Sequence, residues 1–94
     1  MPPEKSDLKY LWDMLDAAQT VGELVRGKSL EDYVSTKALR LAVERAIEII
    51  GEAARRVSDA TREQHPDIPW SAIVATRHII AHEGPAPRLR RLPG

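Results

Sequence analysis

The sequence of 94 residues has no cysteine and balances 14 lysine and arginine residues against 14 aspartate and glutamate residues, so its formal net charge is zero. This composition excludes disulfides and thiolate zinc sites, and it provides no overall positive field for nucleic acid, so any such contact must be a local pocket. No apolar run approaches the ~18 residues of a membrane span and no signal peptide opens the chain, which predicts one cytoplasmic domain without membrane contact.

The first predicted helix covers residues 7–26, after a lead-in at residues 1–6 that contains two prolines. Apolar residues recur along it at helical spacing, and Gly27 is well placed to end it. The apolar stripe consists of Leu8, Leu11, Trp12, Leu15, Ala18 and Val25. We therefore interpret Trp12 as a residue of the core.

The middle of the chain predicts a short helix followed by the longest one. Ser29 and Asp32 have the spacing of a capping box, which should open a short helix that ends near Val34. The long helix covers residues 37–58 and has one apolar and one charged face. Its apolar face consists of Leu39, Val43, Ala46, Ile50, Ala53, Ala54 and Val57. Gly51 lies in mid-helix, where it costs about 1 kcal/mol relative to alanine, so we expect another helix to approach closely there.

The last third of the chain predicts a short turn, a loop and a final helix. Asp59 or Thr61 can cap the turn, and His65 is expected in the loop because it precedes a proline. The final helix runs from Trp70 to about Glu83. The pattern as a whole predicts an all-α, up-and-down helical bundle.

Arg77 has an unusual position, because it lies within the apolar stripe of the final helix. That stripe consists of Trp70, Ile73, Val74 and Ala81. An arginine in such a place should find an acidic partner, a phosphate or a second protein chain. Glu52 and Glu48 of the long helix are candidate partners. Ile79 points away from the stripe, so this helix is expected to have apolar contacts on two sides.

Three interpretations of Arg77, His78 and His82 remain open on spacing alone. The two histidines, four residues apart, can be metal ligands, but zinc needs a third protein ligand and His65 lies before the helix. They can also be structural residues near a dimer seam, with an ion pair for Arg77. The third interpretation is metal-independent RNA cleavage, with histidine as acid or base and arginine on the phosphate. Arg77 and His82 diverge by roughly 140° on one helix, and a two-fold dimer with a shared cleft would explain how they could still cooperate in this chemistry.

The run from Arg77 to His82 resembles the signature of HEPN-domain proteins: an arginine, a polar residue, three further residues and a histidine. The surrounding sequence is similar to the HepT-like toxins of HEPN/nucleotidyltransferase toxin–antitoxin pairs. The runs IIGEA at 49–53 and PDIPW at 66–70 are the most telling parts, and the resemblance covers residues 7–83.

The resemblance implies a HEPN-type bundle that forms a homodimer or a higher oligomer and cuts RNA without a metal or a cofactor. By position, Arg77 would hold the phosphate, His82 would be the acid–base group, and His78 would be a supporting polar residue. The implied partner is a cognate minimal nucleotidyltransferase antitoxin. An interpretation from another class stays open: a non-catalytic dimeric helical module that binds a partner nucleotidyltransferase or a nucleotide.

The resemblance ends at Glu83, and residues 84–94 form an irregular tail rich in proline and arginine. HepT-like proteins normally continue into another helix, so we expect a bundle truncated at the C-terminus with apolar surface left uncovered on its first helices. They also carry, two residues after the histidine, a tyrosine to which the antitoxin attaches AMP. That position is Gly84 here, which has no hydroxyl. We hypothesise a frameshift at codon 84, which would leave the chain either inert or restrained by binding alone.

Overall fold

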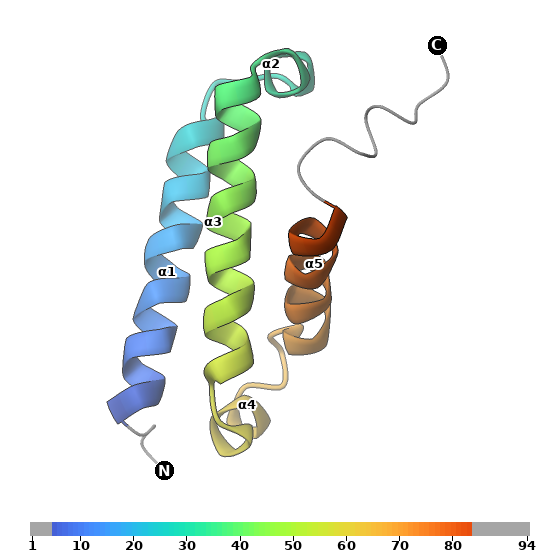
Figure 1. Cartoon of the computed structure of the whole chain (residues 1–94). Helices are drawn as coiled ribbons and strands as arrows, with labels where there is room; N and C mark the ends of the chain where they lie inside the picture. The colour runs from blue at the N-terminus through green and yellow to red at the C-terminus, as the bar shows by residue number, and fades with distance from the viewer. Residues whose placement is uncertain (1–4, 84–94) are drawn as a thin grey trace.

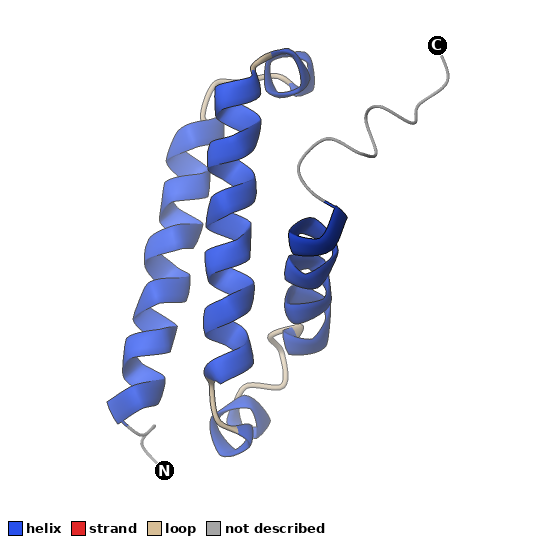
Figure 2. Cartoon of the chain, in the orientation of Figure 1, coloured by secondary structure: helices blue, strands red, loops and turns tan. Residues whose placement is uncertain are grey.

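The structure, a computed structural model, describes residues 5–83, with side-chain surroundings for residues 5–79. Over these residues it contains five helices and no strand (Figure 2), which confirms the predicted all-α bundle. The helices are α1 (Lys5–Val25), α2 (Leu30–Ser35), α3 (Lys37–Arg56), α4 (Asp59–Gln64) and α5 (Trp70–Glu83).

Helix α3 is the centre of the bundle. Figure 1 shows α1, α3 and α5 side by side, with α3 in the middle and running opposite to both neighbours, while α2 and α4 lie at its two ends. A core of Ala54, Val57 and Trp70 lies where the end of α3 meets the start of α5. Partly buried apolar side chains pack around it, namely Tyr10, Leu11, Met14, Ile68, Ile73 and Val74. Among the described residues, no helix is long and apolar enough to cross a membrane.

The connection from α1 to α3 follows the predicted local rules. Gly27 has φ +71°, a left-handed conformation that suits glycine at the end of a helix. The Asp32 N–H donates to Ser29 Oγ at 3.0 Å, and the Ser29 N–H donates to Asp32 Oδ2 at 2.9 Å, so the capping box is formed. These two features turn the chain back so that α3 runs antiparallel to α1.

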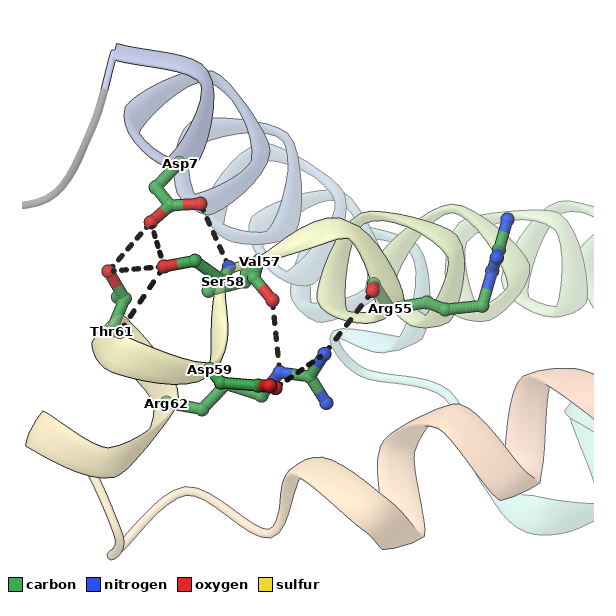
Figure 3. A network of polar contacts seen from close by, with 7 residues as sticks. All are labelled: Asp7, Arg55, Val57, Ser58, Asp59, Thr61 and Arg62. Carbon is green, nitrogen blue, oxygen red and sulfur yellow. Dashed lines mark hydrogen bonds and ion pairs between the residues drawn. The ribbon is translucent and has the colours of Figure 1, made fainter.

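A buried carboxylate ties α1 to the start of α4 (Figure 3). Asp7 is only 1 % exposed and accepts from the Ser58 N–H at 2.9 Å, the Ser58 hydroxyl at 2.6 Å and the Thr61 hydroxyl at 2.7 Å. Ser58 is the N-cap of α4, so the prediction of Asp59 or Thr61 in that role was wrong. The physical reason is that Ser58 has an extended backbone and its hydroxyl accepts from the Thr61 N–H at 3.3 Å. For the same reason α3 ends at Arg56, two residues earlier than predicted.

The predicted core position of Trp12 was wrong, because its side chain is 67 % exposed. The side of α1 that faces the bundle carries Asp7, Met14 and Ala17. Trp12 lies about 140° around the helix from that side. Leu8 and Leu15 are exposed beside it and form, with Trp12, an outer ridge on α1. Helix α1 therefore has two apolar faces, and only one of them is buried in this chain.

Candidate functional site

Helix α5 is anchored by its first residue. The Trp70 side chain is buried, and its indole Nε1–H donates to the His65 carbonyl oxygen at 3.0 Å. Ile73 and Val74 continue the contact with the core one turn later. Two turns after Trp70, the same face of α5 presents Arg77 toward α3, which is how an arginine comes to lie in an apolar stripe.

Gly51 makes room for Arg77. A Cβ at this position would overlap the Arg77 Cβ and lie 2.7 Å from the Arg77 Cγ and 3.2 Å from the Ile73 carbonyl oxygen. These atoms belong to the base of the side chain and to the backbone, so they cannot move aside cheaply. The close helix approach predicted at Gly51 is therefore confirmed, and the helix that approaches is α5.

Glu52 is the acidic partner of Arg77. It is one of the two candidates, Glu52 and Glu48, that the sequence predicts. Arg77 Nη2 lies 3.4 Å from Glu52 Oε2, while Arg55 Nη2 and Arg56 Nε lie 2.8 and 3.0 Å from Glu52 Oε1. The hydrogen bonds from Arg55 and then Arg56 lower the pKa of Glu52 from 4.5 to about 2. Glu52 is thus a fixed anion at neutral pH, suited to holding arginines and unsuited to donating a proton.

Arg77 opens onto a cavity of about 300 Å³ between α1 and α5, here called the α1/α5 groove. Its lining comprises Lys9, Tyr10 and Asp13 of α1, Arg45, Glu48, Ile49, Glu52, Ala53 and Arg56 of α3, and Arg77 of α5. Hydrogen bonds to Glu52 and Tyr10 raise the pKa of Arg56. The groove therefore brings four cationic side chains from three helices to one surface.

His78 does not share this groove. It lines a separate cavity of about 490 Å³, together with Arg55, Arg62, Ser71, Val74, Ala75 and Ile79. Consecutive residues on a helix are rotated by about 100°, which places His78 and Arg77 on different sides of α5. Within one chain, the structure therefore separates the predicted supporting residue from the predicted phosphate-binding residue.

His82 is the next-to-last residue of α5, and its side chain lies outside the described part of the structure. The helical backbone through Glu83 keeps the rotation of roughly 140° between Arg77 and His82. Gly84 and the tail at 84–94 also lie outside the described residues. The predicted catalytic role of His82 and the altered tyrosine position thus remain predictions.

The other cations of the groove were not among the site residues predicted from the sequence. Arg45 and Arg56 belong to the face of α3 that was interpreted as solvated, and Lys9 comes from α1. A signal was present, since Arg45, Glu52 and Arg56 follow one stripe of α3 at spacings of seven and four residues. No pattern within α1 alone could show that Lys9 would face this stripe.

Comparisons with known proteins give a consistent result. The family model of HepT-like ribonucleases matches residues 14–83. A candidate RNase of Methanocaldococcus jannaschii is 39% identical over 80 residues, which cover 84% of this chain and 73% of the relative. A protein of Thermococcus cleftensis named as a probable ribonuclease HepT is 34% identical over 79 residues, covering 84% and 72% of the two chains.

A candidate RNase of Caldanaerobacter subterraneus is 37% identical over 79 residues, which cover 84% of this chain and 70% of the relative. No solved structure matches the chain. The family match contains the whole of α3 and α5, and with them Gly51, Glu52 and Arg77. The chain belongs to the family of HepT-like ribonucleases.

Proposed function

We propose that this protein is a metal-independent endoribonuclease, the toxin of a HEPN/nucleotidyltransferase toxin–antitoxin pair, with its active site in a cleft between two copies of the chain. The observation that carries the proposal is the state of Arg77. Its guanidinium is held by Glu52 at 3.4 Å, remains about one-third exposed and lines the α1/α5 groove. An arginine fixed in this way can bind a phosphate without first having to be ordered.

The chemistry divides between the two residues of the family motif. A base removes the proton of a ribose 2′-hydroxyl, the 2′-oxygen attacks the adjacent phosphorus, and an acid protonates the 5′-oxygen that leaves. The products are a 2′,3′-cyclic phosphate and a free 5′-hydroxyl. We assign the proton transfers to His82, because histidine titrates near neutral pH. Arg77 stabilises the charge that develops on the phosphate oxygens.

This assignment calls for a homodimer, because the two proton transfers need two groups and one chain offers one histidine at the motif position. The surface of α5 is compatible with a seam, since Ile79 is 41% exposed beside the cavity that contains His78. His78 would then act as a supporting polar residue near the seam. The proposed antitoxin is a minimal nucleotidyltransferase, which would have to restrain this chain by binding, because Gly84 offers no hydroxyl for AMP.

The test is RNA cleavage by the purified full chain in excess EDTA, with a 5′-labelled single-stranded RNA of mixed sequence. Arg77→Ala and His82→Ala should each reduce the cleavage rate by about 100-fold or more while the helical CD signal is retained. His65→Ala is the matched control, because His65 is an exposed loop histidine and its variant should cut at the wild-type rate.

Two results would overturn the proposal. One is a wild-type chain that leaves the RNA intact in EDTA, and the other is cleavage that persists in both motif variants. Sedimentation that shows only monomer at micromolar concentration would remove the dimer cleft from the mechanism.

A further inference from the structure

The α1/α5 groove presents a row of cations that is longer than one phosphate. Arg45 and Arg56 are eleven residues apart on α3, which corresponds to about 16 Å along the helix axis. Arg77 reaches α3 between them, at the level of Gly51 and Glu52. Arg45 therefore lines the groove more than two helical turns before Arg56, while Arg56 and Arg77 meet at Glu52. A row of cations drawn out in this way suits an extended polyanion better than a single small anion.

The carboxylates of the groove hold these cations in place but do not fully neutralise their charge. Arg45 Nη1 lies 3.5 Å from Glu48 Oε2, and Glu52 holds Arg56 and Arg77. Four cationic and three acidic side chains line the groove, namely Lys9, Arg45, Arg56 and Arg77 against Asp13, Glu48 and Glu52. Glu52 also pairs with Arg55, which does not line the groove. Part of the negative charge of Glu52 is therefore offset from outside, and the net positive charge of the groove is larger than four cations against three anions would give.

The cations are also accessible. The side chains of Arg45 and Arg56 are 71% and 51% exposed, so both keep donors that their carboxylate partners do not use. A guanidinium that is held in place and still exposed is well suited to a phosphodiester, which it can bind through two parallel hydrogen bonds.

We propose that the α1/α5 groove is a binding track for the backbone of single-stranded RNA, in which Arg45 and Arg56 bind phosphates on either side of the one held by Arg77. This inference rests on the proposed ribonuclease function and adds the residues that position the strand. Basic grooves that follow the backbone are the general means by which proteins bind single strands without reading their sequence. The track predicts that the enzyme prefers an unpaired segment several nucleotides long to a dinucleotide.

The chain supplies a matched control for Arg56. Arg55 is its neighbour on α3, bonds the same Glu52 oxygen at 2.8 Å against 3.0 Å, and has a side chain exposed to 54% against 51%. Arg55, however, lines the cavity of His78 and not the α1/α5 groove. Arg55→Gln and Arg56→Gln therefore remove the same charge and the same kind of ion pair, the first from the cavity of His78 and the second from the α1/α5 groove.

The experiment measures binding of a fluorescein-labelled single-stranded RNA 12-mer of mixed sequence by fluorescence anisotropy, in the His82→Ala background so that the RNA stays intact. Arg56→Gln should weaken binding by about tenfold and lower the salt dependence by about one phosphate contact. Arg45→Gln should likewise weaken binding and lower its salt dependence. Arg55→Gln should stay within about twofold of its parent, since it removes a charge and a Glu52 partner but leaves every cation of the groove in place. CD spectra establish that each variant is folded, and Arg45, as the more exposed residue, keeps the test valid if Arg56→Gln unfolds.

The outcomes separate this inference from the function on which it rests. If the wild type cuts RNA but Arg45→Gln and Arg56→Gln bind like their parent, the track is wrong and the ribonuclease stands. Equal weakening by Arg55→Gln and Arg56→Gln would also overturn the track, because net charge would then explain both. A polyglutamate 12-mer that binds more tightly than RNA and depends on Arg56 would assign the groove to an acidic protein segment instead. A wild type that neither binds nor cuts RNA would remove both proposals.

Discussion

Arg77 lies directly over Gly51, so the side chain that matters most in the candidate site rests on the one position of α3 where a side chain is missing. A Cβ at residue 51 would overlap the Arg77 Cβ and come within 2.7 Å of its Cγ. The neighbouring Glu52 then holds the guanidinium at 3.4 Å. Two consecutive residues of α3 thus place Arg77, the first by leaving space and the second by charge.

Gly51→Ala should lower the free energy of unfolding by about 1–3 kcal/mol, because the added methyl group forces α5 away from α3. This loss outweighs the gain of about 1 kcal/mol that alanine brings to a helix interior. Gly22→Ala is the control: nothing lies within 4 Å of its Cβ, so the same substitution on α1 should stabilise the protein. Urea unfolding followed by CD measures both, and a stabilising Gly51→Ala would contradict the close approach.

Glu52→Gln should change how stability depends on pH. The pKa of Glu52 falls from 4.5 in the unfolded chain to about 2 in the fold, mainly through Arg55 and then Arg56. Because the unfolded chain binds the proton more readily, the stabilisation from ionised Glu52 is complete above about pH 5 and is lost as the pH falls toward 2. The difference in Tm between wild type and Glu52→Gln should therefore be constant near neutral pH and shrink below about pH 4.5.

Thermal unfolding by CD at a series of pH values measures this difference. The comparison isolates residue 52, since every other carboxyl group is common to the two proteins. A difference in Tm that persists unchanged at about pH 3 would show that Glu52 is not held by its arginines in the folded state.

The Arg77 contact could be predicted from the sequence because local rules leave few solutions there. A glycine in mid-helix needs a compensating contact, and an arginine in an apolar stripe needs an anion, so the sequence predicts a close helix approach at Gly51 and leaves Glu48 or Glu52 as the partner of Arg77. The structure confirms the close approach and selects Glu52. The helices themselves followed from the period of their apolar residues, with α3 and α5 within a few residues of the predicted ends.

The orientation of α1 could not be predicted in the same way. Its outer ridge of Leu8, Trp12 and Leu15 has as good a helical period as the buried side with Met14 and Ala17. The buried side also contains Asp7, whose charge hides it from any search for apolar periodicity. Only the partners of Asp7, which lie more than fifty residues away on Ser58 and Thr61, show which face turns inward. The same orientation of α1 decides whether Lys9 faces the α1/α5 groove, so this cation could not be predicted either.

Asp7→Ala should destabilise the fold by about 2–3 kcal/mol. The carboxylate accepts three hydrogen bonds from Ser58 and Thr61, and its loss leaves their donors without this buried acceptor. Asp16→Ala is the matched control, because Asp16 is an exposed carboxylate on the same helix. Its removal should change the free energy of unfolding by no more than about 0.5 kcal/mol. Chemical denaturation gives both values, and equal effects would mean that the Asp7 network contributes no more than surface charge.

The two tryptophans report on the two faces of the bundle. Trp12 is 67% exposed, whereas Trp70 is 7% exposed and donates its indole N–H to His65. Trp70→Phe leaves Trp12 as the only indole, and its emission should lie at long wavelength and be strongly quenched by acrylamide. Trp12→Phe leaves Trp70, whose emission should be shifted to shorter wavelength and protected from the quencher.

The concentration dependence of this quenching also tests where copies of the chain meet. If the dimer seam is on α5, as we propose, the outer ridge of α1 stays in water and Trp12 is quenched equally at nanomolar and at high micromolar concentration. Protection of Trp12 that appears only at high concentration would place the seam on Leu8, Trp12 and Leu15 instead. Because that ridge lies on α1, such a dimer would not be built on α5, and the proposed mechanism would lose the α5 seam that brings the second histidine to the site.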